Sequence, residues 1–194
     1  MRKSEKTRRT LETDIKLILN IDGRGKSNIK TGIGFFDHML TLFSKHGLFD
    51  LEVDCQGDLH VDGHHTVEDI GIVLGKAFKD ALGDKKGIRR YSHVYTPMDE
   101  SLTCIVVDIS GRPYLAFDVD FTREKVGEFD TELVEEFLRG FVNSSKITLH
   151  VKLVEGKNTH HIIESIFKGL GRALDKATVI DERINGVMTT KGVI

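Results

Sequence analysis

The sequence contains the same five-residue pattern twice, and this repetition constrains the fold more than any other feature. Residues 64–68 and 160–164 both read HHxxE, so the two copies lie 96 residues apart (160 minus 64). At this offset the residues that follow the first copy recur after the second: Ile70, Leu74, Gly75, Ala77 and Ala81 match Ile166, Leu170, Gly171, Ala173 and Ala177. A chain of 194 residues with such a repeat is predicted to consist of two similar halves.

The likeness continues upstream of each HHxxE copy at a slightly larger offset. With 98 residues between partners (138 minus 40), Leu40, Phe43, Leu51 and Val53 match Leu138, Phe141, Leu149 and Val151. On this offset His38 falls opposite Glu136. We therefore expect a first half over residues 1–92 and a second half over residues 93–194, joined near residues 84–95 and packed as one compact unit.

Each half shows the same kinds of predicted elements. Alternation of apolar and polar residues predicts strands at 14–22, 48–54, 101–109, 114–120 and 147–154. Helical periodicity predicts helices at 35–45 and 131–142, and an apolar stripe at helical spacing follows each HHxxE copy. Strands and helices mixed in this way indicate an α+β fold in which the sheets pack on a helical layer.

The composition excludes several functional classes. The 28 Lys and Arg residues are balanced by 30 Asp and Glu residues, so the chain lacks the basic excess of a nucleic-acid-binding protein. No apolar run approaches the roughly 20 residues that a membrane span needs. The basic start leads into no apolar signal segment, and the two cysteines form no CxxC pair. We therefore expect a cytoplasmic protein with neither a nucleic-acid partner nor a membrane partner.

The HHxxE pattern suits metal binding at the start of a helix. His64 and His65 lie four and three residues before Glu68, so each can share a helix face with this carboxylate. The two adjacent histidines point away from each other, and each pair therefore suits two ions better than one closed site. Imidazole with carboxylate favours Mn²⁺, Fe²⁺ or Zn²⁺, and Asp62 and Asp69 are candidates to orient the ring nitrogens. Without a metal these histidines would be ordinary residues at a helix start, but two equivalent copies favour the metal site.

Other polar residues suggest how a substrate is held. The order HHxxE excludes a zincin protease, which needs two histidines four residues apart with Glu between them. Residues 97–101 read PMDES and form a predicted acidic turn whose carboxylates can hold substrate hydroxyls or act as bases. Arg90, Arg112 and Lys168 are candidate phosphate contacts, and the tail at residues 189–192 (TTKG) also suits an anion. Taken singly, each of these is more often a solvated surface residue.

Six motifs in order along the chain carry a resemblance to a known family. They read RRTLETDI, TGIGFFDHML, GDLHVDGHHTVEDIGIVLG, PMDESL, GKNTHHIIESIFKGLGRAL and TKG. In these motifs the chain closely resembles the imidazoleglycerol-phosphate dehydratases, hydro-lyases that convert imidazole glycerol phosphate to imidazole acetol phosphate and water in L-histidine biosynthesis. The resemblance implies two tandem repeats related to the second domain of ribosomal protein S5. It also implies two Mn²⁺ ions per active site and a homo-oligomeric shell of twenty-four subunits, with active sites formed between neighbours.

The resemblance also assigns metal ligands, residue by residue. One ion would be bound by His64, Glu68 and His160. The other would be bound by His38, His65, His161 and Glu164. Many members of the family have His where this chain has Glu136, and we expect Glu136 to coordinate metal because it falls opposite His38 in the repeat.

Further roles follow from the same resemblance. The residues expected to be catalytic are Glu12, His65, Glu68 and Glu164, with Glu12 as an acid/base. The phosphate of the substrate would be bound by Arg90, Arg112, Lys168, Thr190 and Lys191, and Asp99 would hold nearby groups in place.

The chemistry of the reaction agrees with these residue types. The leaving hydroxyl sits on the carbon next to an imidazole ring, and no carbonyl acidifies the C–H bond that must break. Metal ions at the ring nitrogens would favour an imidazolate, whose electrons can expel hydroxide to give a diazafulvene. Two other functions stay open: a di-metal hydrolase of phosphate esters, which would release phosphate, and an S5-like scaffold that binds metal or RNA without catalysis.

Overall fold

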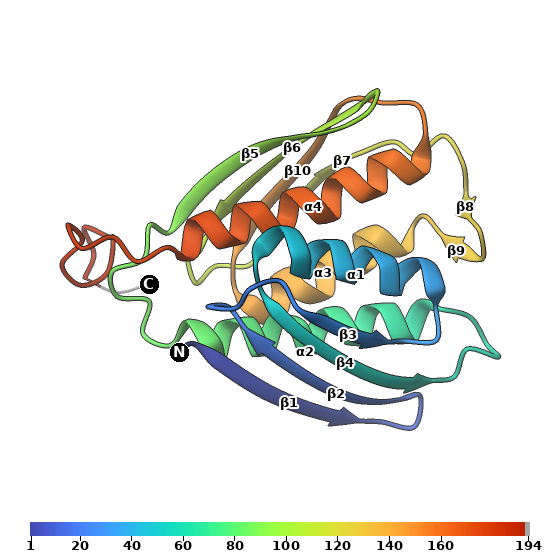
Figure 1. The fold of residues 1–194 in the computed structure, drawn as a ribbon, viewed down its shortest axis with the longest axis horizontal. Helices are drawn as coiled ribbons and strands as arrows, with labels where there is room; N and C mark the ends of the chain where they lie inside the picture. Colours follow the sequence, from blue (N-terminus) through green and yellow to red (C-terminus); the bar gives the residue numbers. More distant parts are fainter. Residues whose placement is uncertain (193–194) are drawn as a thin grey trace.

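The computed structural model describes residues 1–192 as two four-stranded sheets with helices between them (Figure 1). The first sheet has the order β1-β2-β4-β3 and comprises β1 (Lys3–Arg9), β2 (Thr13–Asn20), β3 (Ser27–Lys30) and β4 (Asp50–Gly57). The second has the order β5-β6-β10-β7 and comprises β5 (Tyr91–Met98), β6 (Ser101–Asp108), β7 (Tyr114–Asp118) and β10 (Thr148–Glu155). The helices are α1 (Gly34–Gly47), α2 (His64–Leu82), α3 (Leu133–Ser145) and α4 (Thr159–Thr178). A short hairpin of β8 (Lys125–Val126) and β9 (Phe129–Asp130) lies between β7 and α3.

The two sheets have the same topology. The central pairs β2–β4 and β6–β10 are antiparallel, and in each sheet the third strand runs parallel to the last, β3 beside β4 and β7 beside β10. The α+β class with sheets on a central helical layer is confirmed. The division expected between residues 92 and 93 falls inside β5, and the connection between the sheets runs through residues 83–90.

Strand formation follows the alternation of side chains where one face is buried. In β2, Ile15, Leu17 and Leu19 are fully buried under the helices, while Asp14 and Lys16 face outward. The five predicted strands correspond to β2, β4, β6, β7 and β10. The structure adds β1, β3 and β5, which are edge strands, and β1 and β3 contain no buried residue. Apolar–polar alternation is weak in β1 and β3 because no side chain of either strand is fully buried.

Close helix packing joins the two halves. Helix α2 packs on α3, and α1 packs on α4. A Cβ atom at Gly75 would lie 2.4 Å from the carbonyl oxygen of Phe141, and one at Gly171 would lie 2.4 Å from that of Phe43. Both pairs are matched by the sequence repeat, so the same backbone approach is built twice. Glycine is required at these positions because any side chain would push the helices apart.

Aromatic rings from three helices form a continuous core. Phe137 of α3 lies 5.4 Å from Phe36 of α1 and 5.2 Å from Phe167 of α4, measured between ring centroids. Because these rings come from both halves, one hydrophobic core is shared between them. Across residues 1–192, no helix is both long enough and apolar enough to cross a membrane.

Candidate active site

Both HHxxE copies begin a helix at the same end of the helical layer (Figure 1). Asp62 Oδ1 accepts the backbone N–H of His64 at 2.7 Å, and Asn158 Oδ1 accepts that of His160 at 3.0 Å. The two acceptors are 96 residues apart (158 minus 62), as are the HHxxE copies. Both satisfy an N–H group that no helical carbonyl reaches, but Asn158 is the N-cap residue of α4, whereas Asp62 precedes Gly63, the N-cap residue of α2.

Glu164 gathers three partners where α1 meets α4. Its Oε2 lies 3.2 Å from His160 Nε2 and 3.9 Å from His38 Nε2, and its Oε1 lies 2.5 Å from Lys168 Nζ. One donor atom from each of His38, His160 and Glu164 lies within 4.8 Å of the other two. Because His38 comes from α1, helix packing brings this group together. The separation suits a single first-row ion bound between them.

The carboxylate of Glu164 is held in its charged form. Its partial burial tends to raise its pKa, but the hydrogen bond from Lys168 and the nearby charges of Lys168, His38 and His160 outweigh this, so the pKa lies below its usual value. The ionised carboxylate is the form that binds a metal.

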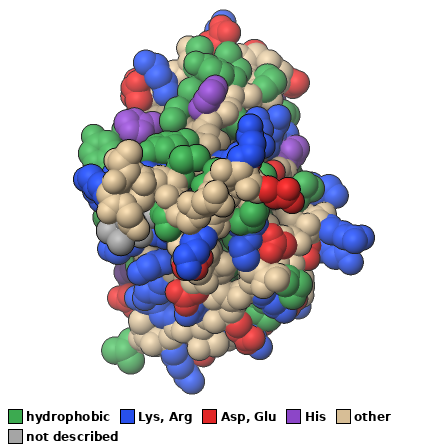
Figure 2. Space-filling view, turned by 90° about the vertical axis from the view of Figure 1, so that its left-hand side faces the viewer, with side chains coloured by type: hydrophobic (Ala, Val, Ile, Leu, Met, Phe, Trp, Pro, Cys, Tyr) green, Lys and Arg blue, Asp and Glu red, His purple; other side chains and the backbone are tan. Residues whose placement is uncertain are grey.

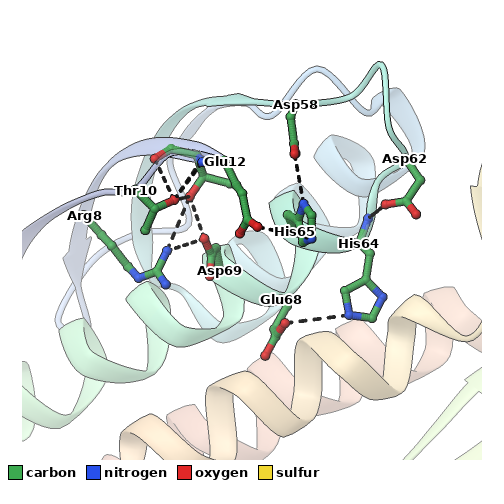
Figure 3. Close-up of polar contacts among 10 residues, drawn as sticks. Arg8, Thr10, Glu12, Asp58, Asp62, His64, His65, Glu68 and Asp69 are labelled. Atoms are coloured by element: carbon green, nitrogen blue, oxygen red, sulfur yellow. Dashed lines mark hydrogen bonds and ion pairs between the residues drawn. The ribbon is translucent and has the colours of Figure 1, made fainter.

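His64 and Glu68 form a second, looser pair on α2. The distance from Nε2 to Oε2 is 3.7 Å, and both side chains turn toward the pale orange helix α3 (Figure 3). Glu136 lies on α3 and forms an ion pair with Arg139, with 3.9 Å between Oε1 and Nε.

The grouping of ligands within one chain differs from the expected partition between ions. His38, His160 and Glu164 are the only three potential ligands within residues 1–192 whose donor atoms come this close. The resemblance assigned His160 to one ion and placed His38 and Glu164 on the other. The helix packing places all three together.

His65 lies between two carboxylates (Figure 3). Its Nδ1 lies 3.0 Å from Asp58 Oδ2, and its Nε2 lies 3.7 Å from Glu12 Oε1. The hydrogen bond to Asp58 raises the pKa of His65. Glu12 lies in the turn between β1 and β2, and this turn places its carboxylate near the ring of His65.

His161 has an analogous environment in the second half. Its Nδ1 lies 2.7 Å from Glu100 Oε2, and its Nε2 lies 4.0 Å from Asp99 Oδ2. The hydrogen bond to Glu100 raises the pKa of His161. Both carboxylates come from the acidic turn between β5 and β6, which sequence reasoning associated with the substrate.

The acids that form hydrogen bonds with Nδ1 of His65 and His161 are Asp58 and Glu100, and not the expected Asp62 and Asp69. Asp62 accepts the backbone N–H of His64 at the start of α2, and Asp69 is buried between α2 and the first hairpin. There Thr13 Oγ1 donates to Asp69 Oδ2 at 2.5 Å, and the Arg8 guanidinium binds the same oxygen. Sequence reasoning missed Asp58 because it belongs to an irregular loop, whose course no periodicity reveals.

Most of the expected phosphate contacts lie at the opposite end of the molecule. Arg90, Arg112, Thr190 and Lys191 line a cavity of about 630 Å³ beside the tail. Helix α4, with 20 residues, spans the molecule between this end and the HHxxE end, a length of about 30 Å. Figure 2 faces the tail and shows Lys and Arg side chains around it. Lys168 lies instead beside Glu164.

Arg90 is buried and already paired. Its Nε and Nη2 donate to Asp108 at 2.7 and 3.1 Å, and its Nη1 donates to the carbonyl of Met188 at 2.7 Å. Arg90 therefore fixes the tail against β6, whereas Arg112 and Lys191 are exposed to solvent and open to an anion.

Comparison with known proteins assigns the chain to a family. A family model described as imidazoleglycerol-phosphate dehydratase matches residues 31–174. A relative of that name from Acetivibrio thermocellus is 63% identical over 193 residues, which cover 100% of this chain and 99% of the relative. The chain belongs to the imidazoleglycerol-phosphate dehydratase family.

Other members of the family agree in sequence and in structure. The protein of that name from Caldanaerobacter subterraneus subsp. tengcongensis is 62% identical and covers 100% of both chains. The crystal structure of the Staphylococcus aureus dehydratase matches with a TM-score of 0.84 at 46% identity, over 92% of this chain and 99% of that one. The structure of the Pyrococcus furiosus protein, described as a complex with (S)-C348, gives a TM-score of 0.83 at 38% identity, over 97% and 100%. Family membership identifies the chain as an enzyme of the lyase class.

Proposed function

We propose that the chain dehydrates imidazole glycerol phosphate to imidazole acetol phosphate in histidine biosynthesis, with Mn²⁺ or a related divalent ion in its active site. The observation that carries this proposal is the pair of HHxxE copies, which present histidine and glutamate donors at the starts of two helices in a chain of this family. Imidazole nitrogens and carboxylate oxygens fit Mn²⁺ and its first-row neighbours, and the donor set contains none of the thiolates typical of structural zinc.

The division of labour in the reaction follows from the positions of the side chains. Bound ions would withdraw electrons from the substrate's imidazole ring and ease the loss of hydroxyl from the neighbouring carbon. Glu12, half-exposed and 3.7 Å from His65 Nε2, stands where it can accept or return a proton. The C–H proton passes to the enzyme base and the hydroxyl leaves as water, so phosphate stays on the product.

The separation between the two ends of the molecule supports the proposal that active sites form between subunits. One small substrate cannot reach both the HHxxE residues and the tail cavity of the same chain, because about 30 Å of helix α4 separates them. Neighbouring copies that place the tail of one subunit beside the helix starts of another would complete each site. A closed homo-oligomer of twenty-four subunits, as the family resemblance implies, meets this need.

Glu136 is proposed as a metal ligand. It occupies on α3 the position that His38 occupies on α1, and α3 faces the helix with His64 and Glu68 as α1 faces the helix with Glu164. Glu136→Ala should lower the Mn²⁺ retained after gel filtration about as much as His38→Ala does, because each change removes one ligand. Glu135→Ala is the matched control, since Glu135 lies on the same turn and pairs with Arg139. Unchanged metal content in Glu136→Ala would place Glu136 outside the metal site.

The activity is tested with purified protein, Mn²⁺ and imidazole glycerol phosphate. The enolised ketone product is followed by its ultraviolet absorbance while free phosphate is measured in the same sample. Growth of absorbance without phosphate release, abolished by a chelator, is the expected result. Phosphate release without ketone formation would overturn the dehydratase activity and favour the hydrolase. If neither product is detected although metal is bound, a non-catalytic scaffold is favoured.

A further inference from the structure

Glu12 and Glu100 occupy equivalent positions in the two halves but contact different ring nitrogens. Each directly precedes the buried residue that opens an inner strand, Thr13 of β2 and Ser101 of β6. Glu12 faces Nε2 of His65, whereas Glu100 binds Nδ1 of its histidine. The two halves have therefore diverged in what this glutamate does.

Glu100 is fixed on both of its oxygens. Oε1 accepts the backbone N–H groups of Lys157 at 3.2 Å and Asn158 at 2.8 Å and the hydroxyl of Ser101 at 3.1 Å, while Oε2 lies 2.7 Å from His161 Nδ1. The hydrogen bond to His161, followed by that from Asn158, lowers the pKa of Glu100. A carboxylate satisfied in this way anchors a ring and is poorly suited to carry protons.

Asp58 takes over the anchoring of the ring in the first half. Its Oδ2 binds His65 Nδ1 at 3.0 Å, and its backbone N–H donates to the carbonyl of Glu12 at 3.0 Å. Asp58 thus fixes both the orientation of the His65 ring and the position of the turn that carries Glu12. The equivalent position in the second half is Gly156 (58 plus 98), where a Cβ atom would lie 2.7 Å from Ser101 Oγ. An aspartate there would have to displace the side chains of Ser101 and Ile162, and Glu100 holds the ring instead.

We propose that Asp58 is a positioning residue that holds His65 with its proton on Nδ1 and its Nε2 lone pair toward Glu12, which leaves Glu12 free for proton transfer. An ionised carboxylate only accepts hydrogen bonds, so Nδ1 must be the donor and Nε2 the nitrogen available to a metal. The same logic makes Nε2 the metal-binding nitrogen of His161. The inference rests on the proposed function for metal binding by Nε2 and for the role of Glu12, whereas the tautomer of His65 is independent of it.

The proposal predicts different effects on Mn²⁺ affinity and on turnover when Asp58, Glu100 or Glu12 is replaced. Asp58→Asn and Glu100→Gln should each weaken Mn²⁺ binding about 10- to 100-fold, the usual effect of removing a carboxylate behind a histidine ligand. Glu12→Gln should keep its Mn²⁺ affinity and lose turnover. Asp58→Glu, which retains a carboxylate acceptor, should recover part of the affinity lost in Asp58→Asn.

The test measures directly, in metal-free protein, which ring nitrogen of His65 carries the proton. Selective ¹⁵N-histidine NMR, at a pH above the titration of His65, should show its proton on Nδ1 in the native chain. In Asp58→Asn the amide can donate to Nδ1, so a measurable fraction should shift to the Nε2–H form. Asp62→Asn is the matched control, because it removes one charge from the same loop but leaves an acceptor for the His64 backbone N–H. That variant should keep the tautomer and the Mn²⁺ affinity.

The outcomes distinguish this inference from the proposed function. An unchanged His65 tautomer or an unchanged Mn²⁺ affinity in Asp58→Asn would overturn the role of Asp58. If the tautomer and the affinities are as expected but the protein never forms the ketone, Asp58 is supported as the residue that orients the His65 ring. The same result would overturn the proposed dehydratase activity and the role of Glu12 in proton transfer.

Discussion

Asp50 illustrates how a single carboxylate holds the backbone of a loop in this protein. Its Oδ1 accepts the backbone N–H groups of Arg24 at 2.9 Å and Lys26 at 3.1 Å, in the turn that leads into β3. These two hydrogen bonds hold the pKa of Asp50 below its usual value. A depressed pKa in the folded state means that the charged form stabilises folding above the unfolded pKa, near 4, and that this stabilisation is lost as the pH falls through the folded pKa.

Replacing Asp50 should therefore have an effect that depends on pH. Asp50→Ala should lower the free energy of unfolding at pH 7 by about 1–3 kcal/mol, because two backbone donors lose a charged acceptor. In Asp50→Asn the deficit relative to the native protein should shrink as the pH falls below about 4. Urea unfolding at pH 7 and at pH 2.5, at equal protomer concentration, measures both. Glu52→Gln, an exposed change on the same strand, serves as the control. A deficit in Asp50→Asn that is the same at both pH values would contradict the charge argument.

Among the elements, helix–helix packing depends on glycines that the repeat preserves. Gly171 of α4 approaches the backbone of α1, and Gly75 of α2 approaches that of α3 in the same way. The expected metal ligands lie on these four helices, so the distance between helices also sets the distance between ligands. His38 and Glu164, for example, meet only because α1 and α4 pack this closely.

A methyl group at Gly171 should separate the two helices. Gly171→Ala would place a Cβ atom 2.4 Å from the carbonyl oxygen of Phe43, so we expect a loss of about 1–3 kcal/mol and weaker Mn²⁺ binding. Gly34→Ala is the control, because a Cβ atom at this helix start meets no atom within 4 Å. Thermal unfolding and metal titration of both variants test this. Equal stability of the two variants would show that the helices tolerate the methyl group.

For the whole molecule, the main feature is that the HHxxE end and the tail cavity lie at opposite ends of one chain. A site shared between subunits has a consequence that mutants can reveal. His160→Ala and Arg112→Ala should each be inactive alone, but mixed assemblies should recover about one quarter of the activity, because half of the subunits supply each intact end. Co-purification of differently tagged chains followed by the ketone assay tests this. Mixed assemblies without activity would place the complete site within one chain.

Metal removal should act on the assembly as well as on activity. If ligands from neighbouring subunits share ions, binding free energy of the metal is also association free energy, and chelation should shift the protein to smaller species. Light scattering before and after treatment with a chelator measures the mass, and added Mn²⁺ should restore it. A chelated sample that keeps its full mass would show that the subunits associate without the ions.

Sequence alone determines much of this protein because the relevant signals are local or repeated. Helical and alternating periodicities identify all four helices and the inner strands β2, β4, β6 and β10, since one face of each is buried against the core. The repeat identifies the two halves, and the spacing of HHxxE identifies residues that share a helix face. The edge strands β1, β3 and β5 escape this reasoning because β1 and β3 contain no buried residue and half of the residues of β5 are exposed.

Only the tertiary structure decides which of these residues meet. It brings His38 close to Glu164. It also forms the hydrogen bonds between Asp58 and His65, between Glu100 and His161, and between Arg90 and Asp108. It also places the tail cations at the opposite end of the chain from the histidines of the two HHxxE copies. The physical reason is that periodicity records which face of an element is buried, whereas contacts between side chains far apart in the sequence depend on helix packing and on the course of irregular loops.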